Sequence, residues 1–237
     1  MRSIKNWFEE LITEKQAKAS VHHTKVLTVI GCGGKTSLIQ HLAASFSPHY
    51  KVLVTTTTKM FPPPPLPGVE LAGVFNEKSG KLESLPPDEL EQKISSFDLV
   101  LIEGDGSQGL PLKAWQEGEP VVPQFTDLTI GVIPLWPLGK PVSNELVHRL
   151  PLFLELTGAR VGEAIEARHI QRLICGRSLP GLFDKALGKK VLFFNQIEDE
   201  KSLKQARQIA EGLPADFRSA LSGIVAGSVR EDMLEEL

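Results

Sequence analysis

Residues 26–37 read Val-Leu-Thr-Val-Ile-Gly-Cys-Gly-Gly-Lys-Thr-Ser, so a β-branched run changes into three glycines and a Lys-Thr pair at the start of an apolar helical pattern. Glycine has no Cβ, which lets the backbone curl around an anion and point several N–H groups inward. The helix that follows directs the positive end of its dipole at the same anion. This stretch predicts a strand over 25–30, a helix over 35–46 and a phosphate-binding loop between them.

The loop matches the short nucleotide-binding pattern GxxGKT from Gly31 to Thr36. It is not the full pattern GxxxxGK[ST], because the first glycine of that pattern would fall at Val29. We expect Lys35 to reach the outer phosphates of ATP or GTP and the Thr36 hydroxyl to hold Mg²⁺. The alternative is an ordinary glycine-rich turn, but the flanking strand and helix and the Lys-Thr pair favour nucleotide binding. The predicted nucleotide contacts here are Gly31, Cys32, Gly33, Gly34, Lys35, Thr36 and Ser37.

The composition indicates a globular protein without nucleic-acid or membrane partners. The chain has 237 residues with a net charge of -3, so it lacks the basic footprint of a nucleic-acid binder. No stretch approaches 18 apolar residues, and acidic residues stand where a signal peptide would be apolar. The two cysteines, Cys32 and Cys175, are too few for a disulfide framework or a four-ligand zinc site and fit a reducing cytoplasm. Cys32 would gain thiolate character at a helix start, but a small packing residue is the favoured interpretation.

Apolar residues recur at helical spacing from Ile4 onward, which predicts an amphipathic helix over 3–19. Its acidic residues favour docking on protein over lying on a membrane surface. We expect residues 1–20 to form this helix, packed on the body, and residues 21–237 to form one nucleotide-binding α/β domain. The His22-His23 pair lacks partners at metal-ligand spacing and is expected to start a strand without binding a metal.

Strands alternate with helices along the rest of the chain. The expected strands are 25–30, 51–56, 98–102, 128–133, 190–194 and 223–226, and the expected helices are 35–46, 87–95, 143–157, 163–174 and 200–212. Ser143 would cap the third helix, Pro151 would kink or restart it, and the proline-rich residues 61–68 would form an extended surface loop. The alternation predicts an α/β fold of the P-loop NTPase type, with a mostly parallel sheet and helices on both faces. Ligands of such sheets gather at the carboxyl ends of the strands.

Two carboxylates, Glu103 and Asp105, follow the apolar strand 98–102. If that strand neighbours the first one, they lie beside the phosphate-binding loop. Mg²⁺ that carries a triphosphate needs only one or two carboxylates, so we expect Glu103 first and Asp105 second to serve the metal together with Thr36. The alternative is a turn in which the neighbouring glycines supply positive φ.

Two further strand ends carry candidate nucleotide contacts. Thr57, Thr58 and Lys59 follow the strand 51–56 and offer hydroxyls and a cation, although a threonine run is also ordinary strand composition. Asn195 and Glu198 follow the strand 190–194 at the place where G-domain GTPases carry Asn-Lys-x-Asp, whose carboxylate accepts two N–H groups of guanine. Both are also ordinary turn residues, so the sequence leaves ATP and GTP open.

Three more side chains are candidates for the catalytic step. His148 and Arg149 lie in the region predicted as a helix after Ser143, and Lys113 lies in the segment Gly-Leu-Pro-Leu-Lys. Arg149 would offer a fork to a transferred phosphate, and His148 would act as acid or base. The alternative is a solvated helix face.

Several motifs together resemble the YqeC family over about residues 24–230. They are Gly-Cys-Gly-Gly-Lys-Thr-Ser at 31–37, Thr-Thr-Thr-Thr-Lys-Met at 55–60, Glu-Gly-Asp-Gly-Ser at 103–107, Gly-Leu-Pro-Leu-Lys-Ala at 109–114, Glu-Pro-Val-Val-Pro at 119–123, His-Arg at 148–149, Asn-Gln at 195–196 and Val-Ala-Gly-Ser at 225–228. The chain has Glu198 where the family typically has aspartate, which leaves the base open, and Gly104 where it has alanine. The Gly-Gly-Lys-Thr segment and the tandem threonines are also similar to the nucleotide sites of Mur-type ligases.

The resemblance implies an accessory role for selenium-dependent molybdenum hydroxylases, in maturing a molybdenum cofactor or installing selenium. Such a hydroxylase, or its cofactor-maturation proteins, would be the partner. The resemblance also strengthens the assignment of Lys113, His148 and Arg149, which match family motifs. We therefore expect a magnesium-dependent NTP hydrolase or transferase with Lys35, Glu103, Lys113, His148 and Arg149 as catalytic residues. The alternative is a nucleotide-gated accessory protein that delivers a cofactor or selenium species without catalysis, and a small-molecule kinase is a third possibility.

Overall fold

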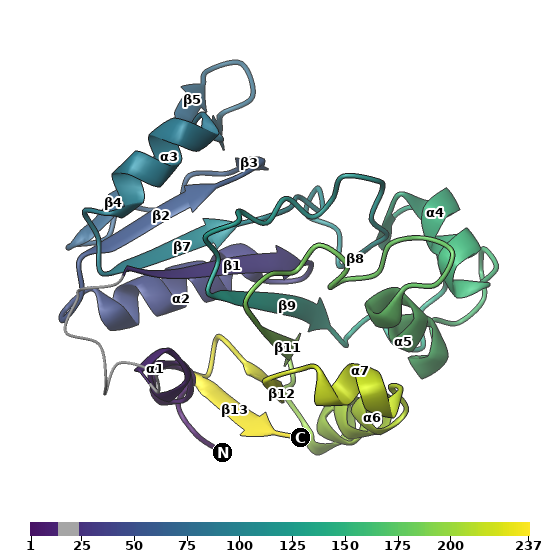
Figure 1. Ribbon diagram of the computed structural model, residues 1–237. Helices are drawn as coiled ribbons and strands as arrows, with labels where there is room; N and C mark the ends of the chain where they lie inside the picture. Colours follow the sequence, from purple (N-terminus) through teal and green to yellow (C-terminus); the bar gives the residue numbers. More distant parts are fainter. Residues whose placement is uncertain (14–23) are drawn as a thin grey trace.

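The computed structural model describes residues 1–13 and 24–237 and contains an eight-stranded central sheet (Figure 1). In spatial order its strands are β13 (Met233–Glu236), β12 (Gly223–Ser228), β11 (Lys189–Asn195), β9 (Leu128–Pro134), β1 (Lys25–Gly31), β7 (Leu99–Glu103), β2 (Val52–Thr56) and β4 (Val69–Leu71). Neighbouring strands are parallel except β12 and β13. The predicted α/β fold with a mostly parallel sheet is therefore confirmed.

Helices cover both faces of the sheet, because successive strand residues point to opposite sides. Val29 packs in the core under α1 (Ile4–Thr13) and α2 (Lys35–Phe46), whereas its neighbour Ile30 packs on the other face. The helices on that other face are α3 (Pro87–Ile94), α4 (Leu150–Thr157), α5 (Ala167–Cys175) and α6 (Glu200–Glu211), and the short helix α7 (Ala215–Ser219) follows α6. Burial on both faces is the reason that the inner strands are nearly continuous apolar runs.

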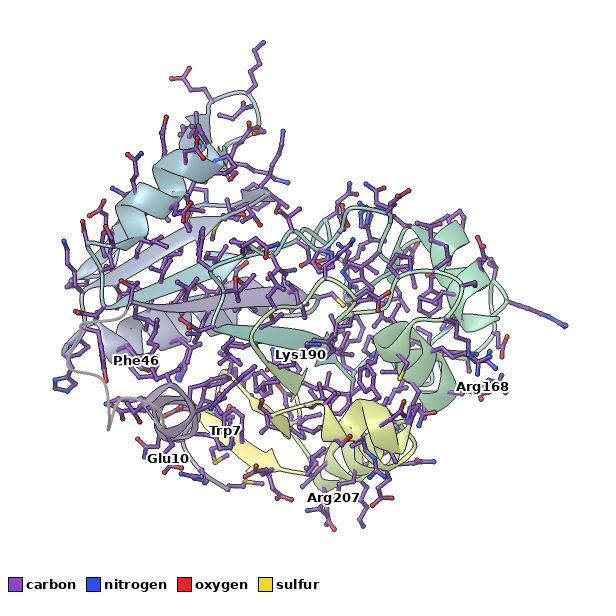
Figure 2. All side chains as sticks on the ribbon, in the orientation of Figure 1. Trp7, Glu10, Phe46, Arg168, Lys190 and Arg207 are labelled. Carbon is purple, nitrogen blue, oxygen red and sulfur yellow. The ribbon has the colours of Figure 1, made fainter. Side chains whose placement is uncertain are left out.

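Helix α1 docks an apolar stripe on the body of the protein. Trp7 is buried, while Glu10 is exposed on the outer side (Figure 2). The backbone N–H of Ile4 donates to Oδ1 of Asp232 at 3.1 Å, which ties the start of the helix to the turn before β13. The remainder of the predicted helix and the His22-His23 pair lie outside the described residues.

The prediction of a helix that begins at Ser143 is wrong. Residues 144–146 form a turn, and Val147–His148 is a short strand, β10, parallel to β8 (Leu112–Lys113). Helix α4 begins only at Leu150, with Pro151 in its first turn, where a missing N–H costs nothing. His148 and Arg149 therefore lie before the helix and not on it.

Other differences concern short elements. Helix α5 begins at Ala167, four residues later than expected, because Glu166 caps it: the backbone N–H of Glu166 donates to Nδ1 of His169 at 3.1 Å in a capping box. The sequence analysis missed β4, β13, α7 and a small sheet of β3 (Lys59–Met60), β6 (Lys81–Glu83) and β5 (Val74–Asn76). Residues 61–68 form the expected loop without helix or strand. Over residues 1–13 and 24–237, the structure contains no helix with the length and apolar character needed to span a membrane.

Candidate functional site

The site is built around the glycine loop, which we define as residues 31–36 between β1 and α2. Gly31, Gly33 and Gly34 have φ values of 101°, 67° and 116°, a region that L side chains rarely adopt. A Cβ at Gly31 would collide with the backbone of Val132, and one at Gly33 would collide with the ring of Pro134. Glycine is thus required at these positions by both backbone conformation and space.

Four backbone donors at the end of the glycine loop have no acceptor in the described part of the protein. The N–H of Gly31 donates to Asp105, and the N–H of Cys32 donates to Val132. No described hydrogen bond uses the N–H groups of residues 33–36, which form the amino end of α2, and Gly34 has no side chain to cap that helix. Such a row of donors at a helix start is suited to an anion.

Lys35 lies across the glycine loop with its side chain only 5% exposed. Its Nζ donates to the carbonyl of Gly31 at 2.8 Å and lies 3.4 Å from Oδ1 of Asp105. Burial alone would lower the pKa of Lys35, but the carboxylates of Asp105 and Glu103 raise it above its ordinary value. The ammonium group is therefore charged at neutral pH, next to the unpaired donors.

Thr36 and Glu103 meet beside the loop. Strand β7 pairs with β1, with Glu103 opposite Val29, so the expected neighbourhood of these two strands is confirmed. Oγ1 of Thr36 donates to Oε2 of Glu103 at 2.7 Å. Burial raises the pKa of Glu103, against the opposing effects of Lys35 and the Thr36 hydroxyl. A hydroxyl and a carboxylate together supply the hard oxygen donors that Mg²⁺ prefers.

Asp105 is fully buried and holds the glycine loop in place. Its two oxygens lie 3.0 and 3.1 Å from the donating N–H nitrogen of Gly31, and Oδ2 also accepts from Nε1 of Trp115 at 2.8 Å. Lys35 and Lys113 bring their ammonium groups to 3.4 and 3.3 Å. These contacts use both oxygens of Asp105 to hold the Gly31 N–H, Trp115 and the two ammonium groups. The sequence analysis missed Trp115.

A network of charged side chains extends from Asp105 to Arg149. Nζ of Lys113 donates to the carbonyl of Gly106 at 2.8 Å and to Glu119 at 3.0 Å. Arg149 places a two-pronged fork on Glu119, with both N–H···O distances at 2.6 Å. Burial would raise the pKa of Glu119, but the hydrogen bond from Arg149 and the charge of Lys113 hold it below its usual value. Glu119 was quoted only as part of a motif in the sequence, and the structure shows that it joins both predicted cations.

His148 lies beside this network, since β10 pairs it with Lys113. Burial, together with the positive charges of Arg149 and Lys113, lowers the pKa of His148. The imidazole is therefore neutral at pH 7 and has a lone pair to accept a proton.

The Glu119 network predicts a defined pH dependence of stability. Because its pKa is lowered on folding, Glu119 stabilises the fold above the pKa of an unfolded glutamate, about 4.3, and this stabilisation is lost as pH falls through the folded pKa. Urea unfolding should therefore show a large difference between wild type and Glu119→Gln at pH 7 and a smaller one near pH 3.5. Glu117→Gln, which alters an exposed neighbour, serves as control and should show no such trend. A difference for Glu119→Gln that does not change with pH would contradict the assignment.

The three predicted contacts after β2, Thr57, Thr58 and Lys59, divide between two places. The N–H of Thr57 donates to the carbonyl of Glu103 at 3.1 Å, and its hydroxyl donates to the carbonyl of Val121 at 2.7 Å. Thr58 lies next to it, with its N–H on the hydroxyl of Thr56. Lys59 lies in the small sheet, where its Nζ is 2.8 Å from Glu83. The structure thus brings Thr57 and Thr58 to the strand ends and pairs Lys59 elsewhere.

Asn195 bridges the glycine loop and the next strand end. Its Nδ2 donates to the carbonyl of Gly33 at 3.0 Å, and its Oδ1 accepts from the N–H of Val229 at 3.3 Å. Both groups of the amide are therefore used within the protein. Glu198 is different, because its side chain is 64% exposed.

Cys32 is a packing residue in the glycine loop. Its side chain is fully buried, and burial raises the pKa of its thiol to about 12. Ser37 is exposed in the first turn of α2. Within the described ranges, no group of three or more His, Cys, Asp or Glu residues is arranged to hold a metal ion.

Comparison with known proteins assigns the chain to a family. A family model for the YqeC protein matches residues 27–151, and the protein named "Uncharacterized protein YqeC" of Escherichia coli (strain K12) is 33% identical over 171 residues, which are 63% of this chain and 67% of that relative. This chain belongs to the YqeC family. The matched segment of this YqeC-family member contains the glycine loop and the network up to Arg149, whereas Asn195 and Glu198 lie outside it. No solved structure matches.

Proposed function

We propose that this YqeC-family protein is a magnesium-dependent nucleotide-binding protein of the P-loop NTPase type that hydrolyses ATP or GTP or transfers its phosphate. The observation that carries the proposal is the row of unpaired N–H groups over residues 33–36, next to the Thr36–Glu103 pair. Donors of this kind cradle phosphates, and the pair would hold the metal beside them. We place the activity in the maturation of selenium-dependent molybdenum hydroxylases, as the family resemblance implies.

The residues present divide into binding, charge and proton roles. The unpaired N–H groups bind the phosphates, and Lys35 moves from the carbonyl of Gly31 to the outer phosphates. Bound Mg²⁺ supplies further neutralisation of phosphate charge. His148, neutral at pH 7, accepts a proton from the attacking group. Lys113 is paired with Asp105 and Glu119, and Arg149 is paired with Glu119, so each cation stabilises transferred phosphate only after it leaves these carboxylates.

Calorimetry with ATP, GTP and their diphosphates, with and without Mg²⁺, tests the proposal. Wild type should bind a nucleoside triphosphate more tightly with Mg²⁺ than without it. Thr36→Val removes the hydroxyl and should reduce this magnesium effect by roughly 10-fold or more. Thr13→Val, at the end of α1, is the matched control and should keep it. If no nucleotide binds, or if Thr36→Val retains the full magnesium effect, the assignment fails.

A nucleotide-gated accessory protein is the second candidate function. The observation that supports it is the network of contacts around Asp105. The same carboxylate contacts Lys35 in the glycine loop and Lys113 in the network that ends at Arg149. Movement of Lys35 toward a phosphate would change the charge balance at Glu119 without any turnover. A pull-down from the native host discriminates the two. A hydroxylase or cofactor-maturation protein retained only with nucleotide supports the gate, whereas rapid turnover without a partner supports the enzyme.

A further inference from the structure

A cavity of about 600 Å³ lies where β11 and β12 end. It is lined by the residues that follow β11, the first turn of α6, the strands β12 and β13 and the turn between these strands, and its apolar walls include Ile197, Leu203 and Met233. The volume is that of a typical small-molecule site, and apolar walls with a few polar groups are the usual lining of such sites. No residue of the glycine loop lines this cavity.

Asn195 connects the cavity to the glycine loop. The amide of Asn195 contacts Gly33 on one side and Val229 on the other. The lining residues Ile197 and Ser228 lie within two positions of these contacts along the chain, and the N–H of Ile197 donates to the carbonyl of Gly227 at 3.0 Å. A ligand with its phosphates on residues 33–36 would therefore have its other end near the cavity.

Among the carboxylates that line the cavity and form a described ion pair, Glu198 has the longest ion-pair distance. Glu231 is 3.1 Å from Arg230, and Glu200 is 3.1 Å from Lys204. Glu198 lies 4.0 Å from Arg230, at the limit of an ion pair, and its side chain is 64% exposed. Its oxygens are thus accessible to hydrogen-bond donors of a ligand.

We propose that this cavity holds the base of a guanine nucleotide, an inference that rests on the proposed function. Guanine presents N1–H and its 2-amino group side by side, and one carboxylate accepts both. Adenine presents a lone pair at N1 in that place, which a carboxylate repels. Ile197 and Met233 cover apolar surface of the base, and Glu198 selects guanine. The amide of Asn195 positions the loop and does not read the base.

Calorimetry on the full chain with GTP, ATP and inorganic tripolyphosphate, all with Mg²⁺, tests this inference. Wild type should bind GTP at least roughly 10-fold more tightly than ATP, since one hydrogen bond to a charged group accounts for such a factor. Glu198→Gln should lower the affinity for GTP by roughly 10-fold and leave that for tripolyphosphate unchanged. Glu200→Gln is the matched control, because it removes a rim charge that is already paired with Lys204, and should change neither.

The outcomes separate the two proposals. Tripolyphosphate binding with equal affinities for GTP and ATP, or a GTP preference that survives in Glu198→Gln, overturns the guanine site and leaves the phosphate site in place. Failure of both tripolyphosphate and GTP to bind overturns the proposed function and the guanine site with it.

Discussion

Lys35→Ala is expected to abolish nucleotide turnover, with a loss of at least roughly 100-fold in the rate of phosphate release. Lys35 lies within the glycine loop, with its ammonium group on the carbonyl of Gly31, and it is charged at neutral pH. Its removal deletes the positive charge that would face the outer phosphates. Release of phosphate from ATP and from GTP, each with Mg²⁺, is the measurement.

Two further variants make the Lys35 result interpretable. Lys140→Ala removes an ammonium group that lies over the ring of Trp136 and makes no described contact with the glycine loop, and this variant should retain the wild-type rate. Lys35→Arg keeps the positive charge beside Asp105. If folded Lys35→Arg has little activity, turnover depends on the geometry of the ammonium group and not on its charge alone. Turnover by folded Lys35→Ala at the parent rate would refute the role of Lys35.

Asp105→Ala is expected to lower the free energy of unfolding by about 3–5 kcal/mol, because it leaves buried cations without their partner. The carboxylate of Asp105 faces Lys35 and Lys113, is fully buried and accepts hydrogen bonds from Gly31 and Trp115. For a chain of this length such a loss lowers Tm by roughly 10 °C. Thermal and urea unfolding at pH 7 measure the change.

Asp184→Ala is the control for this second variant, since Asp184 is exposed and should tolerate the change within about 0.5 kcal/mol. The free energy of unfolding of Asp105→Asn should lie between those of Asp105→Ala and wild type, because asparagine keeps an acceptor for the N–H of Gly31 and loses the charge. Equal stability of Asp105→Ala and wild type would show that the network around Lys35 and Lys113 does not depend on this carboxylate.

The order of the strands in the sheet brings some of the predicted site residues together and leaves others apart. The apolar run that ends at Glu103 predicted a buried strand, but only the pairing of β7 with β1 places Glu103 against Thr36. The same pairing brings the loop after β7 next to β1, where Asp105, an expected metal ligand, accepts the N–H of Gly31. Glu119 and Trp115 were missed as site residues because each lies in a loop. A loop has no hydrophobic periodicity from which a contact with a distant residue could be predicted.

The region around His148 shows why helix patterns mislead at such sites. The apolar residues after Ser143 have helical spacing, yet pairing between β8 and β10 holds Val147 and His148 in an extended strand. Pro151 is compatible with the first turn of α4 and not with a helix interior, so the helix starts later. Tertiary pairing outweighed local propensity, which is worth only a fraction of a kcal/mol per residue.

The amino-acid sequence by itself determined the parallel α/β architecture and the glycine loop, because buried strands need apolar runs and the backbone at Gly31, Gly33 and Gly34 needs residues without a Cβ. Only the tertiary structure decided which charges meet. Asp105, Glu119 and Arg149 are separated along the chain, and their contacts follow from strand order and loop packing, which no local pattern encodes. Residue types thus predicted which chemical groups the site contains, whereas the fold decided which of these groups contact one another.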